Sequence, residues 1–155
     1  DPPPNVKFIK IFSADDMQKV ITKFSNLDIG IFSAAVSDFK VKKVKKLKEK
    51  KKKITNLKLI KNVDILEKIG NSKFNRPKLL IGFAAETGGI DLAKRKLKRK
   101  NCDMIVYNKI DSQNKIFGSD YNRISIITKN YTKNFNKMTK INCAKIIIDC
   151  IHKLS

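Results

Sequence analysis

Lysine is the most frequent residue in this chain that could take part in chemistry, and it is concentrated in one stretch. The segment from Lys40 to Ile54 has the sequence KVKKVKKLKEKKKKI. An ammonium group binds phosphate as a point charge. The stretch could therefore be a nucleic-acid-binding arm, a solvated loop, or a segment in which one or two lysines contact the phosphates of a ligand.

Three apolar runs end in small or polar residues that could line a ligand site. They are SAAVSDF (33–39), GFAAET (82–87) and VYN (106–108). In open α/β sheets, ligands bind at the carboxyl ends of the strands. Alanine at a strand end lets a planar or charged ligand approach the backbone. These residues predict where a site lies, but they do not identify its ligand.

The composition allows one domain with a hydrophobic core and weakens the case for nucleic acid as the partner. The chain has 155 residues, 41% of them hydrophobic, and a formal net charge of +21. Such a charge often indicates a polyanion partner. Only four of the basic residues are arginine, the type favoured for reading base edges, and the chain is also rich in Asn and Ile. Drift toward A- and T-rich codons explains this composition without specific nucleic-acid binding.

The three cysteines, Cys102, Cys143 and Cys150, form no CxxC pair and have no metal-ligand spacing with the single His152. Scattered thiols suit a reducing cytoplasm, and no apolar run is long enough to cross a bilayer. We therefore expect a cytoplasmic protein without a membrane partner, and leave any metal ligands unassigned. The start, DPPPNVKF, lacks methionine and is typical of a linker, so we expect a fragment.

Strand-like and helical patterns alternate along the chain, which predicts an α/β fold. Ser13 is expected to cap the first helix, Asn62 to cap a second helix that stops near Gly70, and His152 to lie near the end of the last. The expected strands are 6–12, 28–36 (buried and parallel), 54–60, 78–87, 102–108 and 122–128 (edge or antiparallel). The last two expected helices are 91–100 and 141–154.

Six segments, taken in order, resemble phosphopantothenoylcysteine synthetase, the phosphopantothenate–cysteine ligase domain of the bacterial bifunctional coenzyme A biosynthesis protein. The resemblance runs from about Pro2 to the C-terminus, and its strength lies in the order and spacing of the motifs. The segments are AAVSDF (34–39), KLKE (46–49), LIKNVDIL (59–66), IGFAAET (81–87), AKRKLKRKNCDMIVYN (93–108) and FGSDYN (117–122).

The resemblance implies a Rossmann-like, mostly parallel sheet flanked by helices, with a flexible flap at about residues 39–53. Residues 1–155 would form the ligase domain, lacking the family's first strand and its glycine-rich segment. FMN would belong only to the decarboxylase domain of a bifunctional parent.

The resemblance also implies a two-step reaction of coenzyme A biosynthesis. CTP, with Mg²⁺, activates the carboxylate of 4′-phosphopantothenate as an acyl-cytidylate. The amine of L-cysteine then attacks this intermediate and CMP leaves, which gives 4′-phospho-N-pantothenoylcysteine. The family acts as a dimer, so a homodimer or higher oligomer is expected of the full-length protein.

Matching the family motifs position by position gives the expected site. Lys46 is the catalytic lysine of the flap, with Lys48 as runner-up. Lys96 and Lys100 reach the CTP phosphates, and their spacing of four places them on one helix face. The remaining expected CTP contacts are Ala34, Ala35, Asp38, Val63, Asp64, Ile65, Leu66 and Phe83.

A further group, Asn108, Phe117, Asp120 and Asn122, is expected to form the substrate-site wall. Two residues depart from the family pattern: Val63 replaces a proline, and Lys109 replaces an aspartate found in many relatives. Plain structural roles remain open for Asp38 in a turn, for Asp120 in a hairpin and for Phe83 in the core. At the level of function, the alternatives are a lysine-rich nucleic-acid-binding module and a folded but inactive relative.

Overall fold

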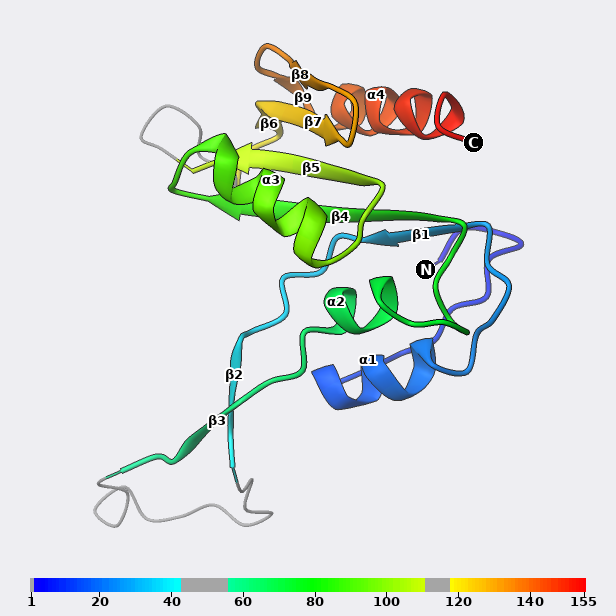
Figure 1. Cartoon of the computed structure of the whole chain (residues 1–155), viewed down its shortest axis with the longest axis vertical. Coiled ribbons are helices and arrows are strands. Elements are labelled where there is room, and N and C mark those ends of the chain that lie inside the picture. Colours follow the sequence, from blue (N-terminus) through cyan, green and yellow to red (C-terminus); the bar gives the residue numbers. More distant parts are fainter. Residues whose placement is uncertain (1, 43–55, 111–117) are drawn as a thin grey trace. The chain divides into compact units, whose positions relative to one another are not determined.

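The structure is a computed structural model that describes residues 2–42, 56–110 and 118–155 (Figure 1). The chain divides into two compact units, each of which is described by itself. Unit 1 comprises Asp1–Lys23 and Ala35–Ile65, and unit 2 comprises Phe24–Ala34 and Leu66–Ser155. The main sheet lies in unit 2.

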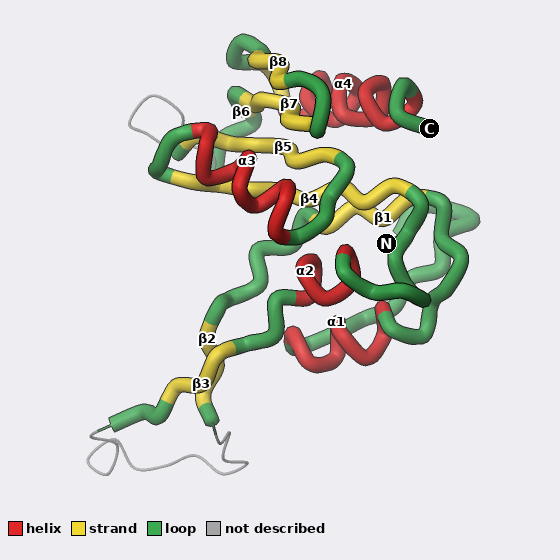
Figure 2. The backbone as a smooth tube through the Cα atoms, viewed as in Figure 1, coloured by secondary structure: helices red, strands yellow, loops and turns green. Residues whose placement is uncertain are grey.

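Unit 2 is built on a five-stranded sheet in the order β1-β4-β5-β7-β8 (Figure 2). β1–β4 and β4–β5 are parallel pairs, whereas β5–β7 and β7–β8 are antiparallel. The α/β prediction is therefore confirmed, with the parallel pairs on one side of the sheet. The strands are β1 (Ile29–Phe32), β4 (Leu79–Glu86), β5 (Met104–Lys109), β7 (Ile124–Thr128) and β8 (Thr132–Asn134).

Helices cover both faces of this sheet, because its central strands are apolar on both sides. On one face, Ile81, Met104 and Val106 pack with α4 (Lys140–His152) in a buried core cluster. Side chains alternate along a strand, so Gly82 belongs to the opposite face. A Cβ at Gly82 would lie 2.6 Å from Leu66 Cδ2, which shows how closely α2 (Ile65–Gly70) approaches.

The basic helix α3 (Ile90–Arg99) packs on the Gly82 face. It buries Ala93 and Leu97 and keeps its charged residues toward the surface. Unit 2 also contains a two-stranded sheet of β6 (Tyr121–Asn122) and β9 (Met138–Thr139). α3 and α4 confirm the two helices expected at 91–100 and 141–154.

Unit 1 contains α1 (Ala14–Ile21) and an antiparallel hairpin of β2 (Phe39–Val41) and β3 (Leu59–Lys61). Ser13 caps α1 as predicted, since its Oγ accepts a hydrogen bond from Asp16 N at 3.1 Å. Lys40 Nζ lies 2.6 Å from Asp15 Oδ1 and ties the hairpin to the helix. The segment with the expected flap lysines falls between β2 and β3, outside the described residues.

The structure corrects several expected elements. Residues 6–12 form no strand despite their alternating pattern, because alternation makes a strand only where a sheet edge is available for pairing. β1 is shorter than 28–36 and lies at the edge of the sheet, so Ile29 and Ile31 are exposed rather than buried. In the third expected strand, 54–60, the described part becomes regular only at Leu59.

The helix predicted after Asn62 ends at Gly70, as expected, but Asn62 does not cap it. The Asn62 amide donates to Ser37 O at 3.0 Å, and its Oδ1 is buried without a hydrogen-bond partner. The strand expected at 122–128 is confirmed as β7, antiparallel to β5, with His152 in the last turn of α4. No helix among the described residues is both long and apolar enough to span a bilayer.

Candidate functional site

The carboxyl ends of β4 and β5 meet at one edge of the unit 2 sheet, which we call the carboxyl edge. In the parallel register Ala85 pairs with Asn108 and Glu86 with Lys109. Ile110 N donates to Glu86 O at 2.8 Å and continues this pairing past the end of β5. The strand ends in GFAAET and VYN, two of the three singled out in the sequence, are therefore neighbours, as a parallel sheet requires.

The carboxyl edge presents different chemistry on its two faces. Glu86 and Lys109 lie on the face covered by α3, because they follow the same alternation as Gly82. Phe83 and Asn108 lie on the face covered by α4, with Ile81 and Val106. The sheet thus separates Lys96, which is expected to bind phosphate, from Phe83 and Asn108 on the other face. A ligand that contacts residues on both faces would have to pass over the carboxyl edge.

On the α3 face, Lys96 forms an ion pair with Glu86. The Lys96 side chain is 35% exposed and that of Glu86 21% exposed, so the pair is only partly shielded from water. The sequence pattern predicted no role for Glu86, although this residue lies in the GFAAET segment. The available signal was that Glu86 is the only acid in that motif and lies at a strand end before Gly88.

Lys100 lies one turn beyond Lys96, since its N–H donates to Lys96 O at 2.9 Å. The expected one-turn relation of the two lysines is therefore present. Lys100 is, however, the C-cap of α3, and a Cβ on Gly70 would lie 1.9 Å from its carbonyl oxygen. Its backbone thus packs against the end of α2, whereas the Lys96 ammonium is held at the carboxyl edge.

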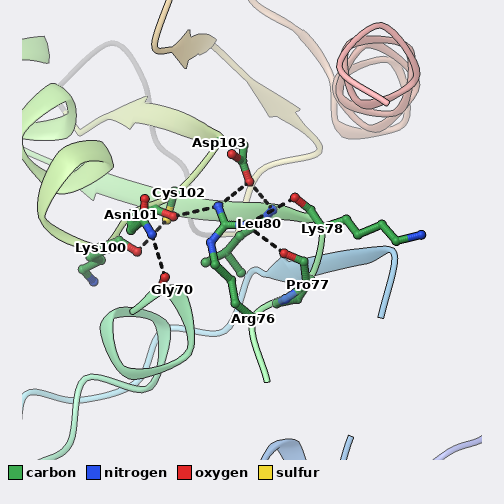
Figure 3. Close-up of polar contacts among 9 residues, drawn as sticks. All are labelled: Gly70, Arg76, Pro77, Lys78, Leu80, Lys100, Asn101, Cys102 and Asp103. Atoms are coloured by element: carbon green, nitrogen blue, oxygen red, sulfur yellow. Dashed lines mark hydrogen bonds and ion pairs between the residues drawn. The ribbon is translucent and has the colours of Figure 1, made fainter. Parts of the chain in front are cut away.

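The opposite edge of the sheet, the amino edge, is closed by a polar cluster around Arg76 (Figure 3). Arg76 Nη2 lies 2.8 Å from Asp103 Oδ2, and that oxygen also accepts from Leu80 N at 2.8 Å. The guanidinium further donates to the carbonyl oxygens of Pro77 and Asn101. This cluster ties the segment before β4 to the turn between α3 and β5.

Asn101 completes that turn. Its φ of 49° is in the left-handed region that asparagine tolerates better than most residues. Its Nδ2 donates to Gly70 O at 2.8 Å, which satisfies a carbonyl at the end of α2. Arg76 Nε is buried without a hydrogen-bond partner among the described residues, whereas the other groups named at the amino edge are committed to internal contacts.

Two buried amides meet on the α4 face of the carboxyl edge. Asn122 Nδ2 donates to Asn108 Oδ1 at 2.8 Å, and the two residues are 9% and 6% exposed. The structure thus brings together two of the four expected wall residues. Asp120 is exposed, and its carbonyl oxygen accepts from Lys140 N at 2.8 Å. Phe117 lies outside the described residues.

Phe83 is partly buried and packs against the core cluster under α4. This contact supports the core-packing interpretation of Phe83, although part of the residue stays exposed. Leu66 is 8% exposed, so a ligand would meet mainly its backbone. Ala34 follows β1 and is exposed.

In unit 1, the hairpin brings Asp38 to the segment that contains NVDIL. Asp38 O accepts from Asn62 N at 2.7 Å, directly before Val63 and Asp64. Ala35, Asp38 and Val63 are exposed, Asp64 is half-buried, and Ile65 is buried. These expected contacts thus come from two separate segments that meet at the base of the hairpin. Lys46 and Lys48 lie outside the described residues.

Within the described ranges, no three or more His, Cys, Asp or Glu residues cluster so that they could hold a metal ion. The three cysteines are free and buried in unit 2, and Cys143 and Cys150 both belong to the core cluster under α4. Burial raises the pKa of the Cys143 thiol, which makes it a poor nucleophile at neutral pH. The chemistry of this region therefore comes from lysines, carboxylates and amides.

Comparisons with known proteins found similar sequences along almost the whole chain. The family model described as "DNA/pantothenate metabolism flavoprotein C-terminal domain" matches residues 1–154. The coenzyme A biosynthesis bifunctional protein CoaBC of Borreliella burgdorferi is 41% identical over 155 residues, covering 97% of this chain and 38% of that protein. The protein of the same name from Haemophilus influenzae is 38% identical over 150 residues, covering 95% of this chain and 37% of its own.

A solved structure shows the same fold. The crystal structure of the C-terminal domain of the coenzyme A biosynthesis bifunctional protein CoaBC aligns with a TM-score of 0.76 at 30% identity. The alignment covers 99% of this chain and 68% of the solved chain. Against the two curated relatives, by contrast, the present chain spans less than two-fifths of the protein length.

Proposed function

Because this chain belongs to the DNA/pantothenate metabolism flavoprotein C-terminal domain family, we propose that it is the ligase domain of coenzyme A biosynthesis. Its reaction would be the CTP-dependent joining of 4′-phosphopantothenate to L-cysteine. The observation that carries the proposal is the family match along residues 1–154, which includes every described residue of the carboxyl edge. Coenzyme A biosynthesis is also the role printed in the names of the two bacterial relatives.

In the first step, a carboxylate oxygen of 4′-phosphopantothenate forms a bond to the α-phosphorus of CTP. The bond from that phosphorus to the bridging oxygen breaks, and pyrophosphate leaves. In the second step, the cysteine nitrogen bonds to the activated carbonyl carbon, CMP leaves with the former carboxylate oxygen, and the amine loses a proton. Both steps depend on holding anionic groups close together, so fixed cations and oriented donors are the expected contribution of the protein.

The residues divide this work in the following way. Lys96, at the carboxyl edge, binds a phosphate, and Lys100 supplies a second charge from the end of α3. Asp38 and the backbone of Val63 and Asp64 contact the nucleotide from the hairpin base. Lys46, with Lys48 as runner-up, acts in catalysis from the segment between β2 and β3. The domain assignment of residues 1–155 and the flap at about 39–53 belong to this proposal.

Mg²⁺ would enter with the triphosphate, because this ion is commonly held by substrate phosphates with one or two carboxylates. The described residues form no acidic or histidine cluster that would hold it alone, so no step is assigned to the ion. FMN would serve only a decarboxylase domain of a longer parent. Homodimerisation and a cytoplasmic location complete the proposal.

Thermal unfolding of the 155-residue chain tests the proposal directly. CTP with MgCl₂ should raise Tm, since a ligand at a hundred times its Kd stabilises by about 2.7 kcal/mol, or several degrees for a chain of this size. ATP at the same concentration is the matched control and should give a much smaller shift. Equal shifts with CTP and ATP, or none with either, would argue against a CTP site.

The alternative function, a lysine-rich nucleic-acid-binding module, rests on the net charge of +21. Charge alone predicts binding that is independent of sequence and weakens steeply with salt. Preference for one DNA or RNA sequence at 0.5 M salt would favour this alternative over the ligase.

A further inference from the structure

The side-chain amide of Asn122 has an orientation determined by the backbone. Arg123 N donates to Asn122 Oδ1 at 2.8 Å. A backbone N–H can only donate, so the atom it meets must be the carbonyl oxygen of the amide. The other end of the Asn122 side chain is therefore the NH₂ group.

This orientation determines that of Asn108 in turn. Asn122 Nδ2 lies 2.8 Å from Asn108 Oδ1, and both residues are buried. Reversing Asn108 would bring two NH₂ groups together without an acceptor, which is costly in a buried place. Asn108 thus turns its oxygen toward Asn122 and its own NH₂ group away from it.

The Asn108 NH₂ group makes no hydrogen bond within the part of the chain that the structure describes. Asn108 as a whole is 6% exposed, and the polar atoms that are fully buried without a partner among the described residues are Asn62 Oδ1 and Arg76 Nε, not the Asn108 NH₂ nitrogen. Asn108 is also the next-to-last residue of β5, on the carboxyl edge and on the same face as Phe83. An NH₂ group at the carboxyl edge that makes no hydrogen bond to the described residues is available to donate to an acceptor atom of a bound ligand.

We propose that Asn122 is a positioning residue that locks Asn108 as a hydrogen-bond donor, so that the α4 face of the carboxyl edge receives an acceptor oxygen or nitrogen of the substrate. The identity of that substrate rests on the proposed function. CTP and 4′-phosphopantothenate both carry suitable acceptors. The ammonium group of cysteine, which only donates, is excluded from this position. The arrangement complements Lys96, which offers positive charge on the other face.

The orientation can be measured without a ligand. In the ¹⁵N-labelled 155-residue chain, NMR hydrogen exchange should show the Asn122 NH₂ group protected and the Asn108 NH₂ group exchanging faster. Asn122→Asp keeps an oxygen that accepts from Arg123 N, but a second carboxylate oxygen takes the place of the NH₂ group that donates to Asn108. The side-chain amide of Asn108 should then turn its NH₂ group toward this oxygen, and that NH₂ group should become protected from exchange. Protection of the Asn108 NH₂ group in the wild-type chain would overturn the proposal.

The ligand role is tested with two separate probes, CTP with MgCl₂ and 4′-phosphopantothenate. One of them should shift the Asn108 NH₂ resonances, and Asn122→Asp should weaken the binding of that probe by about 10- to 100-fold. Asn136→Asp is the matched control, because Asn136 is exposed and the substitution makes the same change in charge. In this variant the Kd of the probe should stay within about twofold of the wild-type value. Asn108→Asp, which keeps an acceptor for Asn122 but lacks the donor, should reproduce the loss even if Asn122→Asp does not fold.

A double-mutant comparison separates positioning from general support of the fold. In an Asn108→Ala background, Asn122→Asp should weaken binding no further, because its effect passes through Asn108. An equal loss in both backgrounds would overturn the proposal. A probe that binds without moving the Asn108 resonances would overturn it while leaving the ligase function standing. If neither probe binds, the proposed function and the ligand role of Asn108 fail together, and hydrogen exchange still decides the orientation.

Discussion

The two edges of the unit 2 sheet use polar residues in different ways. At the amino edge, Arg76 and Asp103 are bonded to each other and also to backbone carbonyl and N–H groups. At the carboxyl edge, Lys96 is paired with the side chain of Glu86, and Asn108 retains an uncommitted NH₂ group. Backbone partners cannot leave without local unfolding, whereas side-chain partners can be exchanged for a ligand. The first edge is thus built for stability and the second for binding.

The largest effect that would test this contrast is a loss of stability at the amino edge. Arg76→Ala leaves Asp103 partly buried without its cation and removes several contacts to carbonyl oxygens. We expect a decrease of about 2–4 kcal/mol in the free energy of unfolding, measured by urea denaturation. Arg95→Ala, on the exposed surface of α3, is the control and should change stability by about 0.5 kcal/mol or less. Equal effects of the two variants would remove the distinction between the edges.

The next effect belongs to the carboxyl edge and should appear in binding. Lys96→Ala removes the ammonium group that Glu86 holds there, so CTP binding should weaken by about 10- to 100-fold, as for the loss of a charged hydrogen bond. The free energy of unfolding should change by about 1 kcal/mol or less, since the ion pair is partly exposed. Calorimetric titration measures the first and urea denaturation the second. Lys94→Ala, on the same helix, should bind CTP normally.

A smaller effect should follow when Glu86 is changed and Lys96 is kept. Glu86→Gln removes the carboxylate that holds Lys96, so the lysine should react several-fold faster with an amine-acylating reagent, as followed by mass spectrometry. Labelling of Lys94 in the same sample serves as the internal control. An unchanged ratio of Lys96 to Lys94 labelling would show that the ion pair does not form in solution.

The smallest effect is expected for Lys78 and Asp28, an exposed ion pair next to the amino edge. Lys78 lowers the pKa of Asp28 below its usual 3.8, and Asp28 raises the pKa of Lys78 above 10.5. The stabilisation from Asp28 is present above about pH 3.8 and is lost as pH falls through its lowered pKa. That from Lys78 is present below about pH 10.5 and is lost as pH rises through its raised pKa.

At neutral pH, Lys78→Met should therefore have less effect on unfolding than any change at Arg76. NMR titration of the Asp28 carboxyl group should show its pKa returning toward 3.8 in this variant. A pKa that stays where it is in the wild type would mean that Lys78 is not its cause.

Features of the fold that depend on residues close together along the chain could be predicted from the sequence. The apolar runs at β4 and β5, the periodicity of α3 and α4, and the Ser13 cap are local patterns, and the structure contains them. The order of the family motifs indicated the family for the same reason, because motifs are contiguous. The lysine-rich stretch stays a prediction, since its central residues lie outside the described part.

Features that depend on contacts between distant residues could not be read in this way. The pattern of residues 6–12 is compatible with a strand, but a pattern alone does not supply a pairing partner. The pairs Arg76–Asp103, Glu86–Lys96 and Asn108–Asn122 join residues on different elements. No local rule chooses such partners, because many lysines and asparagines in this chain have equivalent neighbours.

The sequence by itself determined the type of the central elements, the lysine-rich composition and the family, because each follows from residues close together along the chain. Only the tertiary structure decided which edge of the sheet holds its charges in backbone contacts and which keeps a lysine and an amide within reach of a ligand. The physical reason is that strand register and alternation, set by packing over the whole sheet, place Lys96 and Asn108 at one edge but on opposite faces.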